Sequence, residues 1–130
     1  MPAGPATDAK KPTMTKPTPD SILPTDSLDD LRERLRRFAA ERDWEQFHTP
    51  KNLAMSIAIE AAEIMEHFQW LTAAQSASLD PAARREVARE IADVLLYLVR
   101  LADVLDIDMA AAAREKIGLN AHKYPVRHGL

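Results

Sequence analysis

Two pairs of acidic residues in the chain share the same spacing. Glu60 and Glu63 form the first pair, and Glu90 and Asp93 form the second. On a helix, positions i and i+3 lie one turn apart, with Cβ atoms roughly 5–6 Å from each other, so two carboxylates can share one cation. Oxygen ligands in a chain without cysteine, and without a regular histidine spacing, favour Mg²⁺ or Mn²⁺ over zinc. The pattern is typical of a divalent-metal site that uses all four acids.

The same spacing also occurs on helices that bind no metal. Acids at i and i+3 are common on the solvated edge of a helix, and spacing alone does not decide between such an edge and a metal site. A ferritin-like di-iron bundle is a second alternative, but it needs Glu-x-x-His motifs. Neither acidic pair has a histidine at the required position, which disfavours the di-iron site.

The acidic pairs fall within two long apolar segments, residues 49–71 and 80–105, whose periodicity predicts helices. At 100° per residue, each pair lies in a stripe roughly 80° wide, and large apolar residues occupy most other directions. Four acids that face each other in apolar surroundings cost several kcal/mol unless a positive charge compensates them. These segments must therefore hold the acids in a mostly buried setting that favours a cation.

Cap signals delimit four helices in one folded domain, residues 26–127. A helix start is indicated where Ser, Thr or Asp precedes a periodic segment, and most clearly where proline follows the cap. The expected helices are 27–43, 49–71, 80–105 and 108–120, with N-caps at Ser27, Thr49, Asp80 and Asp108. With 3 glycines in 130 residues, we expect an all-α fold, a four-helix bundle.

The remaining composition excludes several classes of protein. Residues 1–25 are rich in proline and poor in large apolar residues, which predicts a disordered N-terminal tail, and residues 128–130 form a short C-terminal tail. A net charge of -3 provides no basic field for a nucleic-acid polymer. Without cysteine or a membrane-spanning apolar run, we expect a cytoplasmic protein with neither a nucleic-acid nor a membrane partner.

A wider set of residues resembles the MazG-like all-α NTP pyrophosphatases, in particular their dCTP pyrophosphatase branch. The resemblance spans roughly residues 27–127 and includes Phe38 to Trp44, Gln46-Phe47-His48, Phe68-Gln69-Trp70, Tyr97-Leu98-Val99 and Lys123-Tyr124-Pro125. It implies a Mg²⁺-dependent hydrolase that converts dCTP, or a base-modified dCTP, to dCMP and pyrophosphate in nucleotide-pool sanitation. Relatives of this fold assemble as dimers of dimers, so the resemblance also implies a homotetramer.

The same resemblance assigns roles to individual residues. The four acids would hold the metal and carry the catalysis. The substrate-binding residues would be Trp44, Phe47, His48 and Trp70 around the base, with Tyr97, Lys116, Asn120 and Lys123 near the phosphates. Without the resemblance, the tryptophans are equally consistent with hydrophobic staples at helix ends. The two lysines and the asparagine are then consistent with a solvated helix end, where cations are favoured.

Two further hypotheses remain open. A non-catalytic helical module could use the acidic seam to dock a basic partner, which accounts for the acids but not for the accompanying tryptophans, tyrosine and lysines. A pyrophosphatase that prefers another nucleotide, such as dUTP, would use the same acids with a different base pocket.

Overall fold

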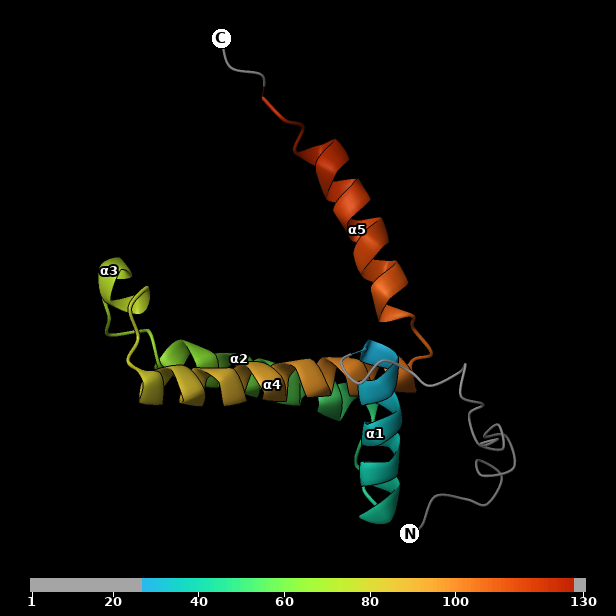
Figure 1. Ribbon diagram of the computed structural model, residues 1–130. Coiled ribbons are helices and arrows are strands. Elements are labelled where there is room, and N and C mark those ends of the chain that lie inside the picture. Colours follow the sequence, from blue (N-terminus) through green and yellow to red (C-terminus); the bar gives the residue numbers. More distant parts are fainter. Residues whose placement is uncertain (1–26, 128–130) are drawn as a thin grey trace, which may run out of the picture.

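The computed structural model describes residues 27–127, which contain helices and no strand, so the predicted all-α class is confirmed. The predicted tails, residues 1–25 and 128–130, lie outside the described residues. Figure 1 shows the helices α1 (Leu28–Glu41), α2 (Pro50–Glu66), α3 (Ala73–Ser76), α4 (Pro81–Val104) and α5 (Met109–Lys123). No helix in this part of the chain combines the length and apolar character needed to cross a bilayer.

All four predicted N-caps are confirmed. Ser27 Oγ accepts a hydrogen bond from the Asp30 backbone N–H at 3.0 Å, and Asp80 Oδ1 accepts one from Ala83 at 2.8 Å. Thr49 and Asp108 cap α2 and α5 in the same way. Each cap satisfies a backbone donor that the first turn leaves unpaired, which is why these short polar residues fix the start of each helix.

The ends of α2 and α5 differ from the predictions, whereas α4 ends at Val104, next to the predicted Leu105. α2 ends at Glu66, not near Leu71, because the next N–H groups bond to carbonyls three residues back and the chain tightens into a turn. The expected linker 72–79 contains α3, whose N-cap Thr72 forms a capping box with Gln75. The apolar pattern continues past Glu66, so periodicity could not reveal this break.

α5 extends to Lys123, three residues beyond the predicted end at Asn120. Tyr124 then leaves the helical conformation, with φ -123° and ψ 72°. It precedes Pro125, whose ring disfavours a helical residue before it. The proline therefore sets the end of α5 more directly than the apolar pattern does.

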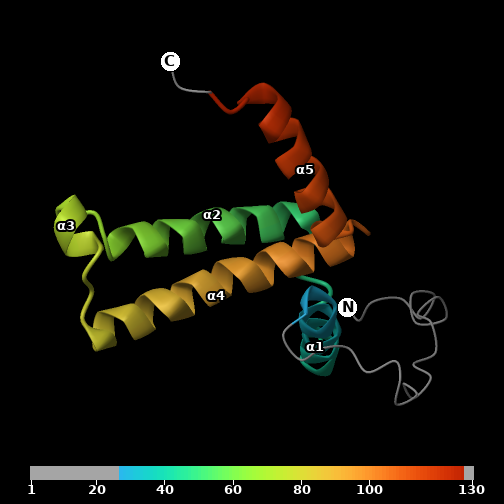
Figure 2. The ribbon, with the colours of Figure 1, turned by 45° about the horizontal axis from the view of Figure 1, so that its top comes forward.

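The two long helices α2 and α4 run antiparallel and pack side by side, while α1 crosses the C-terminal half of α4 (Figure 2). The buried apolar residues sit mainly where these three helices meet: Ala39, Leu53, Val87, Val99 and Ala102. Apolar burial is the main driving force for folding, so this junction is the core of the described chain. Outside this core, the middle parts of α2 and α4 face each other, and these parts carry the acids.

The fourth long helix does not complete the predicted four-helix bundle. α5 has no buried residue and projects away from the end of α4 (Figures 1 and 2). Its Ile117 is 68% exposed, and on α2 and α4 Ile59 and Ile91 are also exposed. Where exposed apolar side chains adjoin one another, they typically mark a surface that another molecule covers.

Candidate metal centre

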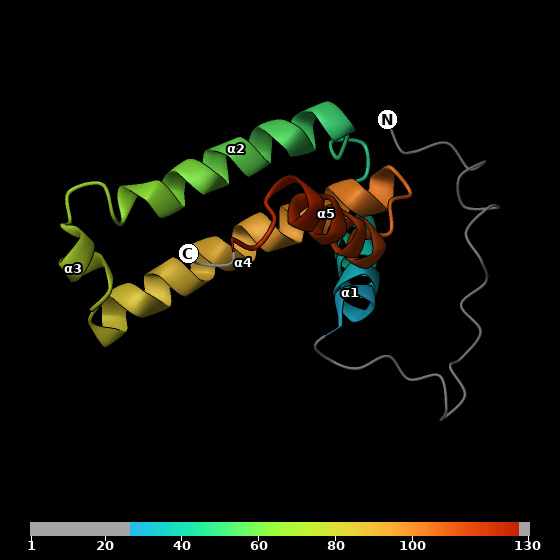
Figure 3. The same cartoon turned by 90° about the horizontal axis from the view of Figure 1, so that it is seen from above.

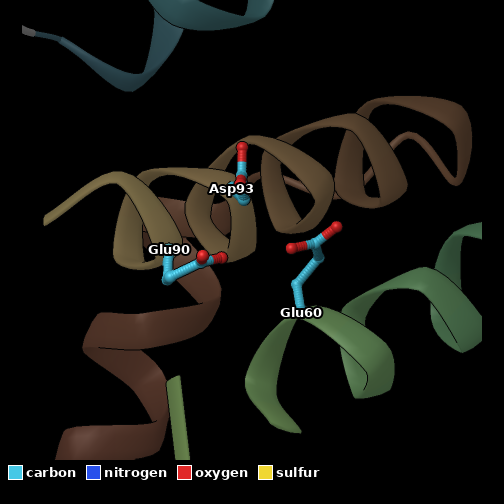
Figure 4. Close-up of side chains that lie close together, drawn as sticks. All are labelled: Glu60, Glu90 and Asp93. Atoms are coloured by element: carbon cyan, nitrogen blue, oxygen red, sulfur yellow. The ribbon is translucent and has the colours of Figure 1, made fainter. Parts of the chain in front are cut away.

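Three carboxylates converge between α2 and α4. Glu60 reaches from α2 toward α4, from which Glu90 and Asp93 project (Figure 4). One oxygen from each of these three side chains lies within 4.8 Å of the other two. Because α2 and α4 are antiparallel neighbours, acids near the middle of both helices meet although they are 30 residues apart in the sequence, as Glu60 and Glu90 are. The cluster can surround one small cation.

Glu63, the fourth predicted acid, is half-buried beside the cluster. Its carboxyl group is close enough to Glu60 and Glu90 to raise the pKa of both. It is not one of the three residues whose oxygens converge. Its predicted part in metal binding and catalysis, like that of the other three acids, stays a prediction.

The cluster holds protons more tightly than ordinary carboxyl groups do. Burial, followed by the neighbouring Glu63, Asp93 and Glu90, raises the pKa of Glu60 from 4.5 to about 7. Burial and Glu63 also raise the pKa of Glu90, while His67 opposes this shift. Both causes disfavour the charged form of a carboxyl group. The positive charge of a bound cation would compensate these carboxyl groups and favour their charged form.

Two buried oxygens indicate where such a charge belongs. Glu60 Oε2 and Glu90 Oε2 are buried and have no hydrogen-bond partner among residues 27–127. A buried polar atom without a partner is costly, so a folded protein rarely keeps one unless something else compensates it. A hard divalent cation with oxygen ligands fits this donor set, whereas a thiolate-bound metal does not.

Stability should depend on pH in a direction that the shifted pKa of Glu60 sets. Between pH 4.5 and about 7, the folded state binds more protons than the unfolded state, so the free energy of unfolding falls as pH rises. Solvent at the rim of the cluster screens these charges, and we expect a loss of about 1 kcal/mol. Thermal unfolding of metal-free protein at pH 5.5 and pH 8 measures it.

Mg²⁺ should reverse most of this loss at pH 8, which is above the pKa of Glu60, and much less at pH 5.5. The stabilisation by a ligand that binds only the folded state grows with its concentration above Kd. An equal effect of Mg²⁺ at both pH values would contradict binding by these carboxylates.

The first tryptophan lies at the α1 end of α2. A left-handed Asp43, with φ 56°, ends α1 and turns the chain back, so that the Trp44 N–H donates to Ala39 O at 2.9 Å. The Trp44 ring packs edge-on against Phe38 and against His48, with centroids 5.5 and 6.1 Å away. It stays 42% exposed, which leaves part of the ring open for stacking. The neighbouring Phe47 is 60% exposed.

Trp70 lies at the opposite end of α2 and is 87% exposed. The 17 residues of α2 separate it from Trp44 by about 25 Å of helix, at 1.5 Å per residue. The expectation that both tryptophans enclose one base is therefore not met within a single chain. Local sequence placed each tryptophan beside a helix end, but the end-to-end distance follows from the helix between them.

The residues expected near the phosphates divide into two groups. Tyr97 lies on α4 one turn after Asp93, on the same side of the helix, and is half-buried. The other three, Lys116, Asn120 and Lys123, are exposed on α5. α5 projects away from α2 and α4 in Figure 1 and is seen nearly end-on in Figure 3, so a single chain does not bring this second group to the acids.

Two residues at the site were not given a role by the sequence. His67 Nε2 lies 3.9 Å from Glu90 Oε1, and Arg100 is only 8% exposed on α4. Arg100 Nε donates to His48 Nδ1 at 3.0 Å. The helical stripes that contain the acids also contain these residues, so their position was readable although their partners were not.

A hollow of about 510 Å³ lies away from the acids, where α1, α4 and α5 meet. Arginines and aspartates line much of it, including Arg32, Arg114 and Asp106. The acid cluster itself is open on the side of Asp93, which is exposed. In one chain, α2 and α4 therefore line one side of the acid cluster, and the cluster is not enclosed on its other side.

Fold and site together define an all-α protein with a carboxylate centre for a divalent cation between two antiparallel helices. A model of the MazG-like family matches residues 55–130. The chain belongs to the MazG-like family.

Sequence identity to two dCTP pyrophosphatases agrees with this membership. The chain is 41% identical to dCTP pyrophosphatase 1 of Rattus norvegicus, over 83% of this chain and 65% of that protein. It is 40% identical to dCTP pyrophosphatase 1 of Homo sapiens, over 81% of this chain and 63% of that protein. The chain thus spans less than two thirds of the length of these two relatives.

The fold has a counterpart among crystal structures. A pyrophosphatase from Archaeoglobus fulgidus superposes with a TM-score of 0.73 at 41% sequence identity. The match covers 81% of this chain and 99% of that structure. The helical arrangement described above is therefore shared with nearly all of that crystallised chain.

Proposed function

We propose that the chain hydrolyses dCTP, or a base-modified dCTP, to dCMP and pyrophosphate in a Mg²⁺-dependent reaction. The observation that carries the proposal is the pair of buried, unpartnered glutamate oxygens at the centre of the acid cluster. The dCTP pyrophosphatase relatives, at about 40% identity, support the choice of substrate. Mn²⁺, which also prefers oxygen ligands, is the alternative metal.

In this reaction, water adds to the α-phosphorus, the bond to the bridging oxygen breaks, and pyrophosphate leaves. Glu60, Glu90 and Asp93 would hold the cation, with Glu63 beside them. A bound Mg²⁺ would neutralise phosphate oxygens and stabilise the leaving group. With the cation bound, the acids would position the triphosphate against α2 and α4, and Tyr97, which is half-buried one turn after Asp93, would orient its oxygens.

The base would stack on the exposed aromatic rings. Trp44, Phe47 and His48 form one candidate wall at the α1 end of α2, and Trp70 forms another at the far end. Because the two walls lie beyond opposite ends of the helix that carries Glu60, a second copy of the chain is needed to bring them to one nucleotide. The same copy would bring Lys116, Asn120 and Lys123 of its α5 toward the phosphates.

We therefore propose a homotetramer as the working form, supported by the uncovered apolar residues and the unpacked α5. Analytical ultracentrifugation should give a mass four times that of the chain. Ile59→Asp places a charge on an apolar position of α2 that is 58% exposed in one chain, and it should dissociate the assembly. Lys51→Asp, at an exposed polar position of the same helix, is the control and should leave the mass unchanged.

The decisive experiment measures pyrophosphate release from each dNTP and from dUTP, with and without Mg²⁺. We expect Mg²⁺-dependent release that is fastest with dCTP or its base-modified forms. Fastest release from dUTP would replace the proposed base preference but keep the reaction. A folded tetramer that is silent toward every nucleotide would favour the non-catalytic docking module, whose acidic seam binds a basic partner.

A further inference from the structure

Arg100 is a buried charged residue near the proposed base site. It lies on α4 with 8% of its surface exposed, and its Nε donates to Nδ1 of His48 in the α1–α2 connection at 3.0 Å. Its Nη1 reaches Asp103 Oδ2 at 3.4 Å, and Arg36 on α1 donates to the same oxygen at 2.7 Å. The side chain of Asp103 is 8% exposed. Arg100 is thus held from one side while it contacts His48 on the other.

This contact determines the form of the His48 ring. A guanidinium group carries only donors, so a hydrogen bond from Arg100 requires Nδ1 to be an unprotonated acceptor. The single proton of the neutral ring must then be on Nε2. Burial and the charge of Arg100 lower the pKa of His48, while Glu45 of the same connection opposes this shift. The groups around His48 therefore favour a neutral ring with one N–H donor.

The location of His48 suits the base of a nucleotide whose phosphates lie at the acids. Arg100 follows Asp93 by seven residues, about 10 Å along α4, and Tyr97 lies between them on the same side. His48 is half-buried, and the partly exposed Trp44 ring packs against its edge. Among the described residues, no hydrogen bond uses His48 Nε2. This N–H is available for a ligand.

We propose that Arg100 is a positioning residue that fixes the His48 proton on Nε2, so that His48 donates to an acceptor of a pyrimidine stacked beside Trp44. The inference rests on the proposed function and adds a means of selecting the base. All three pyrimidines carry an acceptor at O2, but N3 is an acceptor in cytosine and carries a hydrogen in uracil and thymine, so the selection requires the His48 N–H to reach N3. A His48 ring whose proton is fixed on Nε2 cannot accept a hydrogen bond there from the N3–H of uracil or thymine. That N–H would stay unpaired in the site, and a site that leaves a polar group of the base unpaired rejects the base.

The kinetic test compares Arg100→Met, His48→Ala and the double variant, with dCTP and dTTP as substrates. Loss of one hydrogen bond should raise KM for dCTP about 3- to 10-fold, and the preference for dCTP over dTTP should fall by a similar factor. kcat should change little. In the His48→Ala background, Arg100→Met should add nothing, because Arg100 acts through His48. A purely structural role would add its effect in both backgrounds.

Two variants control for folding. Arg89→Met makes the same substitution on α4 at a side chain that is 73% exposed and pairs with Glu86 of the same helix, so it should leave kinetics unchanged. Arg100→Lys keeps a positive charge and an N–H donor at this position, and it should retain most of the base preference. If Arg100→Met does not fold, the KM for dCTP and the preference for dCTP over dTTP are compared between Arg100→Lys, His48→Ala and the wild type instead.

A second measurement does not depend on activity. Nitrogen NMR of the full chain labelled in histidine, without nucleotide, should show His48 with a bare Nδ1 and a protonated Nε2, and His48→Asn assigns its signals. In Arg100→Met, His48 should take up a second proton at a higher pH than in the wild type, because a repelling charge is lost.

Protonated Nδ1 in the neutral wild-type ring, or additive effects of the two substitutions on KM, would overturn the inference. Absence of turnover with every nucleotide would overturn the proposed function, while the NMR result would still decide whether Arg100 sets the His48 proton. The two failures are therefore distinguishable.

Discussion

Replacing Glu60 with glutamine should lower kcat by about 10²-fold or more while it makes the metal-free protein more stable. The loss follows because the substitution removes a charged ligand from the centre proposed to bind the cation. The gain follows because glutamine has nearly the same shape but no charge to bury beside Glu63, Asp93 and Glu90. Activity and stability should thus change in opposite directions.

The stability change has a pH signature. At pH 8 wild-type Glu60 is charged, since its pKa is about 7, so the gain of Glu60→Gln should be present there and absent near pH 5. A gain of about 1 kcal/mol corresponds to a rise in Tm of roughly 4–8 °C for a domain of this size. Differential scanning calorimetry without metal measures it, and Mg²⁺ should stabilise the variant less than the wild type.

Glu66→Gln supplies the matched control. Glu66 is on α2 but exposed, and it is not among the acids that converge. It should therefore keep wild-type kcat and Tm at both pH values. If Glu60→Gln retained full turnover, the acid cluster would not be the catalytic centre, and the proposed reaction would need another site.

Trp70→Ala should raise KM for the nucleotide about 5- to 150-fold, because stacking on an aromatic ring is worth about 1–3 kcal/mol per base. kcat should stay near the wild-type value, since Trp70 lies beyond the end of α2, away from the converging acids. The fold should also be unaffected because 87% of the residue is exposed. Steady-state kinetics with dCTP separate the two parameters.

Trp70→Phe is the conservative variant, and it should recover most of the affinity because it keeps an aromatic face. Trp44→Ala is a less clean comparison, because the Trp44 ring packs on Phe38 and on His48 and its loss should also cost stability. Unchanged KM in Trp70→Ala would remove this residue from the base site and leave Trp44 as the stacking partner. Neither result depends on which base is preferred.

Much of the fold was predictable because its signals are local. The four N-caps each bond to a backbone N–H three residues ahead, so the cap and its partner are read from one short stretch of sequence. The break of α2 at Glu66 was not predictable from periodicity, since apolar residues continue beyond it. The capping box of Thr72 and Gln75 was a readable signal for α3, and it was missed.

The sequence by itself determined the all-α class, the helix starts and the face of each helix on which the acids lie, because these depend on spacing within one element. Tertiary structure decided which faces meet. It brought Glu60 to Glu90 and Asp93, joined Arg100 to His48, and left α5 without a buried residue. Contacts between helices depend on how their surfaces pack over long sequence separations, and helical spacing carries no record of that choice.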